Sequence, residues 1–310
     1  MERKVGIIIV NFNGGQLTAE CLEDLKRQSH GAISIMVVDN GSTDGSVDMI
    51  KTGFPTAVCI ETGENLGFAR GNNVGIRASL DDPDIRYLLL LNNDTECDPS
   101  MLEVLIECLE KEPEVAAVGP KIYYFDEPDR IWSFGGNLKY RETVTREIGK
   151  GRFDRGQFDR ERDVDFITSC CMLISRKALE EVGLLDPNYF INVDDADWCT
   201  RARRAGYRIL FTPKTKIWHK VAMSTGGSYK PFKTFHTGRS NAIYVRKFGK
   251  PLQRFSFLCF AGFGLIAAFF REVLRGGAPA VFAKAKGIYR GLTDPLLELE
   301  KTTGAERTAK

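Results

Sequence analysis

Three polar residues, Asn92, Asn93 and Asp94, directly follow an apolar run over residues 87–91. A carboxylate on a short turn after a buried strand is suited to a hard divalent cation, which prefers oxygen ligands and offsets the charge of a phosphate. We therefore interpret Asp94, with Asn92, as a candidate site for Mg²⁺ or Mn²⁺. The same residue types also favour a plain turn that begins a helix, and this structural alternative stays open.

A second group of carboxylates, Asp194, Asp195 and Asp197, lies ahead of a basic segment over residues 201–204. Three acids within four residues repel one another. That cost is more readily tolerated where one acid acts as a base and the others are held by arginines or a helix N-terminus. Asp194 and Asp195 are therefore candidate catalytic residues. A helix with an acidic first turn and a basic last turn would give the same pattern.

Two polar loops supply candidate ligands for a nucleotide. Asp39 ends an apolar run that begins at residue 33, and its carboxylate could accept hydrogen bonds from a base or a ribose. The loop over residues 63–73 is rich in glycine and asparagine, and its Arg70 could contact a phosphate. This loop matches neither G-x-G-x-x-G nor G-x-x-x-x-G-K-[ST], which removes the main support for a dinucleotide or P-loop site.

His219 is one of three histidines and follows a short apolar segment. An imidazole at this point could bind a metal or contact a phosphate. The alternative is a buried structural histidine that needs a single hydrogen-bond partner, which is the commoner case for a lone histidine.

Apolar runs and helical patterns alternate through the first 120 residues. Repeated β-α units of this kind build a parallel sheet with helices on both faces, and ligands bind beyond the carboxyl ends of its strands. Strands are expected at 4–10, 33–39, 57–60, 87–91 and 115–118, and helices at 17–25, 68–80 and 101–111, with Asp44 capping a short helix around 47–50. Later strands are expected at 164–174, 208–211 and 216–219, and later helices at 176–182 and 195–205, whereas residues 121–163 show no clear pattern.

The composition is typical of a folded globular protein, since 43% of the 310 residues are hydrophobic and 27% are charged. None of the eight cysteines forms a C-x-x-C pair, so we expect reduced and mostly buried thiols. The apolar run over residues 5–10 is too short for a signal peptide. These features together predict a cytoplasmic protein.

The chain between Arg246 and Arg290 carries nine basic residues and one acidic residue, so its net charge is +8 and the remainder sums to −6. Within it, residues 255–270 carry no charge and are bracketed by Arg254 and Arg271. A sixteen-residue helix is about 24 Å long, which is short for a bilayer core of about 30 Å. We therefore expect a peripheral helix on an anionic membrane surface, with a packed core helix, a homodimer contact and a true span as alternatives.

Taken together, the motifs closely resemble glycosyltransferase family 2, whose members have the GT-A fold. The resemblance covers residues 4–249 and is carried by the segments 7–13, 38–44, 65–73, 91–94 and 190–207. Within the family it is nearest to the bacterial rhamnosyltransferase type, as the segment 132–136 and the pair Tyr123 and Tyr124 indicate. It implies a Rossmann-like, mostly parallel α/β sheet over residues 1–245 and a basic helical appendage over residues 246–310.

The resemblance also implies roles for particular side chains. Asp195 matches the family's catalytic base, with Asp194 beside it, and Asp94 matches the main carboxylate of the metal motif. The first acid of that motif is Asn92 here, so one or two side chains could contact the metal, and His219 matches a position that completes the site in some members. The residues implied in donor binding are Asn11, Asp39, Asn65, Arg70, Asn73 and Asn93.

The family implies an inverting transfer of one sugar from a nucleotide-diphosphate donor, with dTDP-rhamnose or a UDP-sugar favoured, to a saccharide or lipid-linked saccharide. We expect this enzyme at the cytoplasmic face of the cell membrane, in cell-envelope polysaccharide synthesis, with no nucleic-acid partner. One alternative is a non-catalytic carbohydrate-binding or scaffold protein on the same fold. The other is a nucleotidyltransferase, which would need a basic phosphate loop where residues 11–15 are uncharged.

Overall fold

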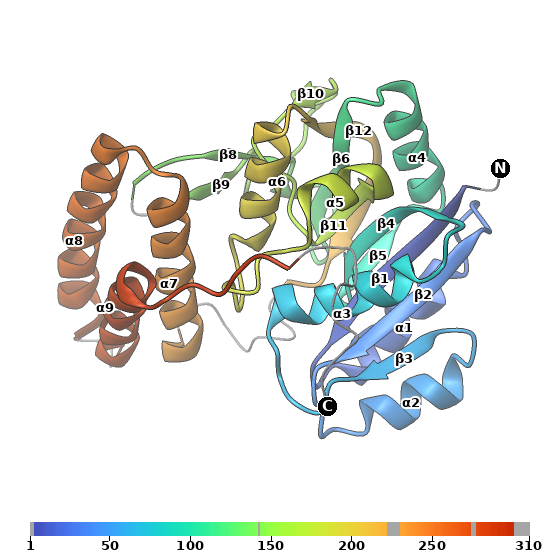
Figure 1. Ribbon diagram of the computed structural model, residues 1–310, viewed down its shortest axis with the longest axis horizontal. Helices are drawn as coiled ribbons and strands as arrows, with labels where there is room; N and C mark the ends of the chain where they lie inside the picture. The colour runs from blue at the N-terminus through green and yellow to red at the C-terminus, as the bar shows by residue number, and fades with distance from the viewer. Residues whose placement is uncertain (1–2, 142, 222–229, 274–276, 301–310) are drawn as a thin grey trace.

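A computed structural model describes residues 3–141, 143–221, 230–273 and 277–300 of the chain. A ten-stranded sheet forms its centre, in the order β10-β12-β6-β11-β4-β1-β2-β3, with β5 paired to β12 and β7 paired to β6. Helices lie on both sides of this sheet, and three C-terminal helices stand beside it (Figure 1). The predicted α/β class and the helical appendage are therefore confirmed.

The strands of the first half are β1 (Lys4–Asn11), β2 (Ile33–Asp39), β3 (Val58–Glu61), β4 (Ile85–Asn92), β5 (Thr95–Cys97) and β6 (Val115–Tyr124). The later strands are β7 (Ile131–Ser133), β8 (Gly136–Leu138), β9 (Thr145–Glu147), β10 (Arg162–Asp163), β11 (Cys171–Ser175) and β12 (Arg208–His219). The helices around the sheet are α1 (Gly15–Leu25), α2 (Ser46–Gly53), α3 (Phe68–Leu80), α4 (Met101–Lys111), α5 (Arg176–Val182) and α6 (Asp194–Arg204). The C-terminal helices are α7 (Pro231–Phe248), α8 (Pro251–Val273) and α9 (Ala278–Thr293).

The strands β1, β2 and β4 are parallel and end in nearly the same row. In this register Asn11 pairs with Asp39 across β1 and β2, and Val10 pairs with Asn92 across β1 and β4. Polar residues at the carboxyl ends of three strands are thereby gathered at one edge of the sheet, where parallel α/β sheets bind ligands.

Both faces of the central strands are buried, because successive side chains of a strand point to opposite faces. One face carries Ile8, Leu88 and Leu90 and packs against α3, α5 and α6. The other face carries Ile7 and Leu89 and packs against α1 and α4. This two-sided burial explains why the strands read as unbroken apolar runs, and it makes the floor of the sheet rigid.

Two antiparallel additions bring further residues to the same edge. β11 pairs with β4, with Cys171 opposite Leu91, so the residues just before Cys171 lie beside the end of β4. β12 pairs with β5, with His219 opposite Thr95, which brings the imidazole next to Asp94. Residues distant in the sequence therefore meet through strand pairing.

Several predicted elements need correction. Of the strand expected over residues 164–174, only β11 forms, because Val164 donates to the Ile209 carbonyl, Phe166 bridges to Gly136, and the chain then changes partner. The two strands expected over 208–219 are one strand, β12, with a register shift inside it. Asp44 accepts from the Ser46 N–H, but Gly45 is the N-cap of α2.

The helix α7 joins the body of the protein to α9 by close backbone packing. A Cβ atom on Gly287 would lie 2.0 Å from the Phe235 carbonyl oxygen, so only glycine allows this approach of the two helices. The segment after α9 returns to the body, where the Asn188 side chain exchanges two hydrogen bonds with the backbone of Leu297. The boundary expected after residue 245 falls inside α7, and a separate C-terminal domain stays a prediction.

The loop before α3 contacts the segment before α6 through Gly67. The φ and ψ of Gly67 are 80° and −178°, values that strongly favour glycine. The Phe68 N–H donates to the Phe190 carbonyl at 2.6 Å, and Asn40 Nδ2 donates to the Gly67 carbonyl at 3.0 Å. A Cβ on Gly67 would lie 2.6 Å from that Phe190 oxygen. Gly67 therefore permits the contact between the two loops.

We predict that Gly67→Ala lowers the free energy of unfolding by about 3 kcal/mol, since it adds a steric clash to the backbone strain. Gly63 is the matched control: its φ is +76°, and a Cβ there meets nothing within 4 Å. Gly63→Ala should therefore cost only about 1 kcal/mol, from the strain alone. Urea denaturation of both variants measures the difference, and equal losses would contradict the proposed clash.

Candidate active site

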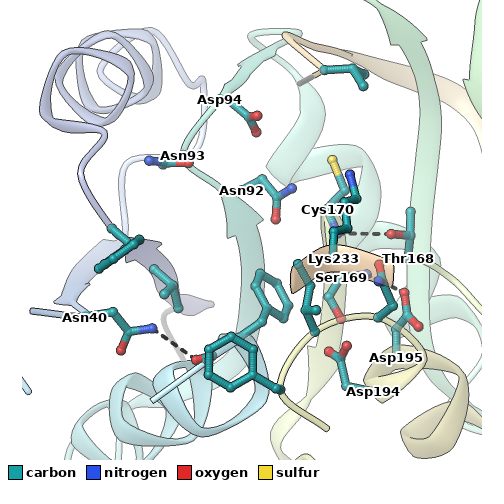
Figure 2. Close-up of a pocket in the computed structure, with 18 of the residues that line it drawn as sticks. Asn40, Asn92, Asn93, Asp94, Thr168, Ser169, Cys170, Asp194, Asp195 and Lys233 are labelled. Atoms are coloured by element: carbon teal, nitrogen blue, oxygen red, sulfur yellow. Dashed lines mark hydrogen bonds between the residues drawn. The ribbon is translucent and has the colours of Figure 1, made fainter. Parts of the chain in front are cut away.

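A cavity of about 660 Å³ opens at the carboxyl ends of β1, β2 and β4 (Figure 2). Its polar lining comprises Asn40, Asn65, Asn92, Asn93, Asp94, Thr168, Ser169, Asn192, Asp194, Asp195, His219, Lys230 and Lys233. Its aromatic lining comprises Phe12, Phe68, Trp132, Phe190 and Phe232. Seven of the residues predicted from the sequence line this cavity: Asn65, Asn92, Asn93, Asp94, Asp194, Asp195 and His219.

Asn11 and Asp39 do not line the cavity but brace its edge. Asn11 is fully buried, and its Nδ2 donates to Asp39 Oδ2 at 2.7 Å, while its Oδ1 accepts from Thr18. The other oxygen of Asp39 accepts the N–H groups of Gly41 and Ser42 at 3.1 and 2.8 Å. These bonds fix the loop after β2, and direct contact of either residue with a nucleotide stays a prediction.

Asn73 and Arg70 also lie outside the lining. The amide of Asn73 exchanges two hydrogen bonds with the backbone of Leu185, at 2.8 and 3.0 Å, and so ties α3 to the loop before α6. Arg70 is exposed on α3. Asn73 therefore has a structural role in joining α3 to this loop. The role of Arg70 and Asn73 in donor binding stays a prediction.

Asp94 and His219 form a buried polar pair beside Asn92. Asp94 is 4% exposed and His219 is 7% exposed, and Asp94 Oδ1 lies 2.9 Å from His219 Nε2. Asn92 Nδ2 lies 3.4 Å from the same nitrogen. Within the described part of the chain, His219 Nδ1 makes no hydrogen bond.

A divalent cation fits this group of atoms. Buried polar atoms without a partner are costly, and a carboxylate, an imidazole and an amide oxygen are ordinary ligands of Mg²⁺ or Mn²⁺. Among the described residues no three His, Cys, Asp or Glu side chains converge on one point, so protein atoms would supply only part of the coordination. An open set of this kind leaves positions for phosphate oxygens and water.

Asp194 and Asp195 begin α6 at another part of the cavity (Figure 2). Burial raises the pKa of Asp195 to about 6, although it accepts the N–H groups of Ala196 at 2.7 Å and Ser169 at 3.4 Å. Burial and the charge of Asp195 raise the pKa of Asp194 well above its ordinary value, and its Oδ2 makes no hydrogen bond in the described structure. The two environments therefore favour a neutral Asp194 beside an ionised Asp195.

The backbone that presents this pair is strained. Asn192 and Val193 have φ values of 65° and 69°, and a β-branched residue rarely adopts such values. The third acid of the run, Asp197, is buried and accepts from Arg201 at 2.8 Å, and it also forms an ion pair with Lys247. Asp197 thus holds α6 in place, whereas Asp194 and Asp195 face the cavity.

Several lining residues could not be predicted from the sequence. Thr168, Ser169 and Cys170 reach the cavity only because β11 reverses beside β4. Lys230 and Lys233 come from the start of α7, far along the chain. The thiol of Cys170 is buried, which raises its pKa well above the ordinary value and makes it a poor nucleophile.

Comparison with known proteins identifies the chain. The profile of glycosyl transferase family 2 matches residues 6–183, which is more than half of the chain. The chain belongs to this family.

Two glycosyltransferase relatives align with most of the chain. One, from Mycobacterium tuberculosis, is named N-acetylglucosaminyl-diphospho-decaprenol L-rhamnosyltransferase and is 24% identical over 71% of this chain and 77% of its own length. The other, the low-salt glycan biosynthesis hexosyltransferase Agl10 of Haloferax volcanii, is 25% identical over 92% of this chain and 91% of its own length. The family 2 protein described here is thus a glycosyltransferase with rhamnosyltransferase-like relatives.

The solved structures support the same fold. The mannosyltransferase PcManGT of Pyrobaculum calidifontis, in complex with GDP-Man and Mn²⁺, superimposes with a TM-score of 0.59 at 17% identity, over 95% of this chain and 88% of that chain. This likeness confirms the predicted GT-A fold for the family 2 glycosyltransferase.

We predict that Asp94→Ala weakens Mn²⁺-dependent binding of UDP or dTDP at least tenfold, because the diphosphate loses its counter-ion. Titration calorimetry with and without EDTA measures this dependence. Glu96→Ala is the matched control, since Glu96 is a partly exposed acid on the adjacent β5 and does not line the cavity. Nucleotide binding that is equally tight in EDTA and in Mn²⁺ would contradict the metal assignment.

Proposed function

We propose that this glycosyltransferase moves one sugar from a nucleotide-diphosphate donor to an acceptor hydroxyl, with inversion at the anomeric carbon. The observation that carries the proposal is one cavity with two chemically distinct groups. Asp94, His219 and Asn92 suit a cation, and Asp195 is a carboxylate with a pKa near 6. A single displacement needs only one base, so this arrangement suits an inverting reaction.

In this proposal Asp195 accepts the proton of the acceptor hydroxyl as its oxygen attacks the sugar. Asp194 remains protonated next to it and keeps the local charge low. A divalent cation bound by Asp94 and His219 would offset the charge of the departing nucleoside diphosphate. Asn65 and Asn93 also line the cavity. Asn65 Oδ1 accepts the Gly67 N–H and Asn93 Nδ2 donates to Thr18, so Asn65 Nδ2 and Asn93 Oδ1 would contact the nucleotide.

The donor and the acceptor are proposed from the relatives. The name of the Mycobacterium tuberculosis relative specifies an L-rhamnosyl group and a lipid diphosphate acceptor, which supports dTDP-rhamnose as donor and a lipid-linked saccharide as acceptor. The name of the Haloferax volcanii relative specifies a hexosyl group, which keeps a UDP-hexose as the second candidate. Either reaction would belong to the synthesis of a cell-envelope glycan.

We predict that Asp195→Asn lowers the turnover of sugar transfer by about 100-fold or more and leaves the affinity for UDP or dTDP unchanged, because it removes the base and keeps the shape. Asp194→Asn is the matched control and should reduce turnover much less. Steady-state kinetics with a panel of dTDP- and UDP-sugars measures both. A larger loss in Asp194→Asn would reverse the assignment within the pair.

The pH dependence provides an independent check on the same base. Asp195 must be ionised to accept a proton, so kcat/KM should fall as the pH drops through about 6, by about tenfold for each unit below it. The Asp195→Asn variant should lose this acidic limb and keep its low activity across the range. An unchanged limb in the variant would assign the titration to another group.

The helix α8 presents an apolar surface to the solvent. By length and composition it could cross a membrane, but Arg254 and Arg271 lie within it and limit the uncharged part to sixteen residues. Seven large apolar side chains of α8 are exposed, and we call this surface the α8 stripe: Leu252, Phe255, Leu258, Phe260, Phe263, Ile266 and Phe270. They cover more than half of the circumference of the helix, while Phe257 and Ala261 on the remaining side are buried.

We infer that the α8 stripe lies on the headgroup region of an anionic membrane and that the enzyme is peripheral on the cytoplasmic face. The uncharged part of α8 is sixteen residues, about 24 Å as a helix, which is short for a bilayer core of about 30 Å, and basic residues flank it, as is typical of an interfacial helix. A lipid-linked acceptor would then meet the enzyme at the membrane surface. The remaining alternative for this stripe is a contact with a second copy of the chain.

We predict that the protein floats with vesicles that contain phosphatidylglycerol at low salt and is released by high salt or mild detergent. The double variant Phe263→Glu/Phe270→Glu should stay in the soluble fraction. Phe153→Glu is the control, because it changes an exposed phenylalanine of similar exposure on a different surface. If the wild type ignores these vesicles and forms a dimer that the double variant loses, a second copy replaces lipid as the partner.

A further inference from the structure

Two lysines at the start of α7 line the cavity without a counter-charge. Lys230 precedes Pro231, the first residue of α7, and Lys233 lies one turn later, and both side chains contribute to the cavity wall (Figure 2 labels Lys233). Within the described part of the chain, neither ammonium group makes an ion pair or a hydrogen bond. Lys230 is exposed and Lys233 is partly buried, whereas the buried Lys121 is paired with Asp154 at 2.7 Å.

The environment of Lys233 calls for an anion. Partial burial and the nearby charge of Lys150 lower the pKa of Lys233, and no carboxylate counteracts them. The acids of the cavity are not within ion-pair distance of this ammonium. A cation that is removed from water and left unpaired is costly, so an anionic ligand would stabilise this part of the cavity.

A second, independent feature of the cavity points to a ligand. Ser169 also lines it; the residue is 2% exposed, and its hydroxyl has no hydrogen-bond partner in the described structure. The same is true of Asn40 Oδ1. Buried polar atoms are almost always satisfied, so an unsatisfied hydroxyl in the wall of a cavity that two unpaired lysines also line favours a ligand with many acceptor oxygens.

We propose that Lys230, Lys233 and Ser169 form a diphosphate subsite that does not depend on the divalent metal. The proposal rests on the proposed function, because either the donor or a lipid-linked acceptor would supply the diphosphate. The diphosphate of a lipid-linked acceptor suits the position of these lysines better than the diphosphate of the donor does. The lysines lie on α7, which packs against α9, the helix next to α8 and its exposed stripe.

The experiment is titration calorimetry with inorganic pyrophosphate in EDTA, which leaves only metal-independent binding. Removal of each lysine should weaken the affinity for pyrophosphate about tenfold. Lys233→Ala should therefore bind pyrophosphate more weakly than the wild type, and the double variant Lys230→Ala/Lys233→Ala more weakly still. Lys233→Arg should retain most of the affinity. Lys177→Ala is the matched control, because it removes an exposed lysine on α5 that has no ion pair in the described structure and lies outside the cavity.

Asp94→Ala separates this subsite from the proposed metal site. It should leave pyrophosphate binding in EDTA unchanged, even if the proposed metal-dependent sugar transfer proves wrong. The proposal is overturned if the wild type does not bind pyrophosphate in EDTA, if the double lysine variant binds as the wild type does, or if Lys177→Ala loses as much affinity as Lys233→Ala.

Two further measurements identify the source of the diphosphate. If Lys233→Ala also weakens UDP or dTDP binding in Mn²⁺ about tenfold, the subsite holds the donor. If nucleotide affinity is unchanged and pyrophosphate competes with the acceptor in the transfer assay, the subsite holds the diphosphate of the acceptor. Each result supports a metal-independent subsite and assigns it to one substrate.

Discussion

The register of β4 between its two neighbours determines where the chemistry can take place. The parallel pairing of β4 with β1 places Asn92 opposite Val10, and the antiparallel pairing with β11 places Cys171 opposite Leu91. Because both pairings are buried, a slip of one residue would turn the apolar side chains of β4 to the wrong face. The end of β4 is therefore fixed, and Asp94 is presented from a rigid base.

Electrostatics accounts for the rest of the arrangement. Three carboxylates line one partly enclosed cavity, where like charges repel more strongly than in water. The protein relieves this repulsion by keeping Asp194 neutral and by placing Asp94 beside His219. A nucleoside diphosphate that binds with its cation would supply the positive charge that these carboxylates lack.

The sequence predicted the parts of the fold that depend on local pattern. The buried strands before Asp39 and Asn92 carry unbroken apolar runs, and α3, α4 and α5 have clear helical periodicity, so their positions were predictable. The strand expected over residues 164–174 failed because apolar residues there are buried without regular pairing. Burial and strand pairing are separate properties, and the pattern reports only the first.

The site residues divide in a similar way. The acids and amides at strand ends could be predicted because their types and positions carry the chemistry. Arg70 and Asn73 have the right residue types, but their side chains lie elsewhere, since a motif does not specify on which side of a helix each residue falls. Lys233 could not be predicted, because its place in the cavity depends on the packing of α7 against the body of the protein.

We propose that one cavity holds both a nucleoside diphosphate and its cation at the end of β4. The most direct test is an anomalous difference map from crystals grown with Mn²⁺ and UDP or dTDP. We predict a manganese peak within bonding distance of Asp94 and His219, with the phosphates in the same cavity as Asp195. A nucleotide bound with its metal away from Asp94, or bound outside this cavity, would contradict the account.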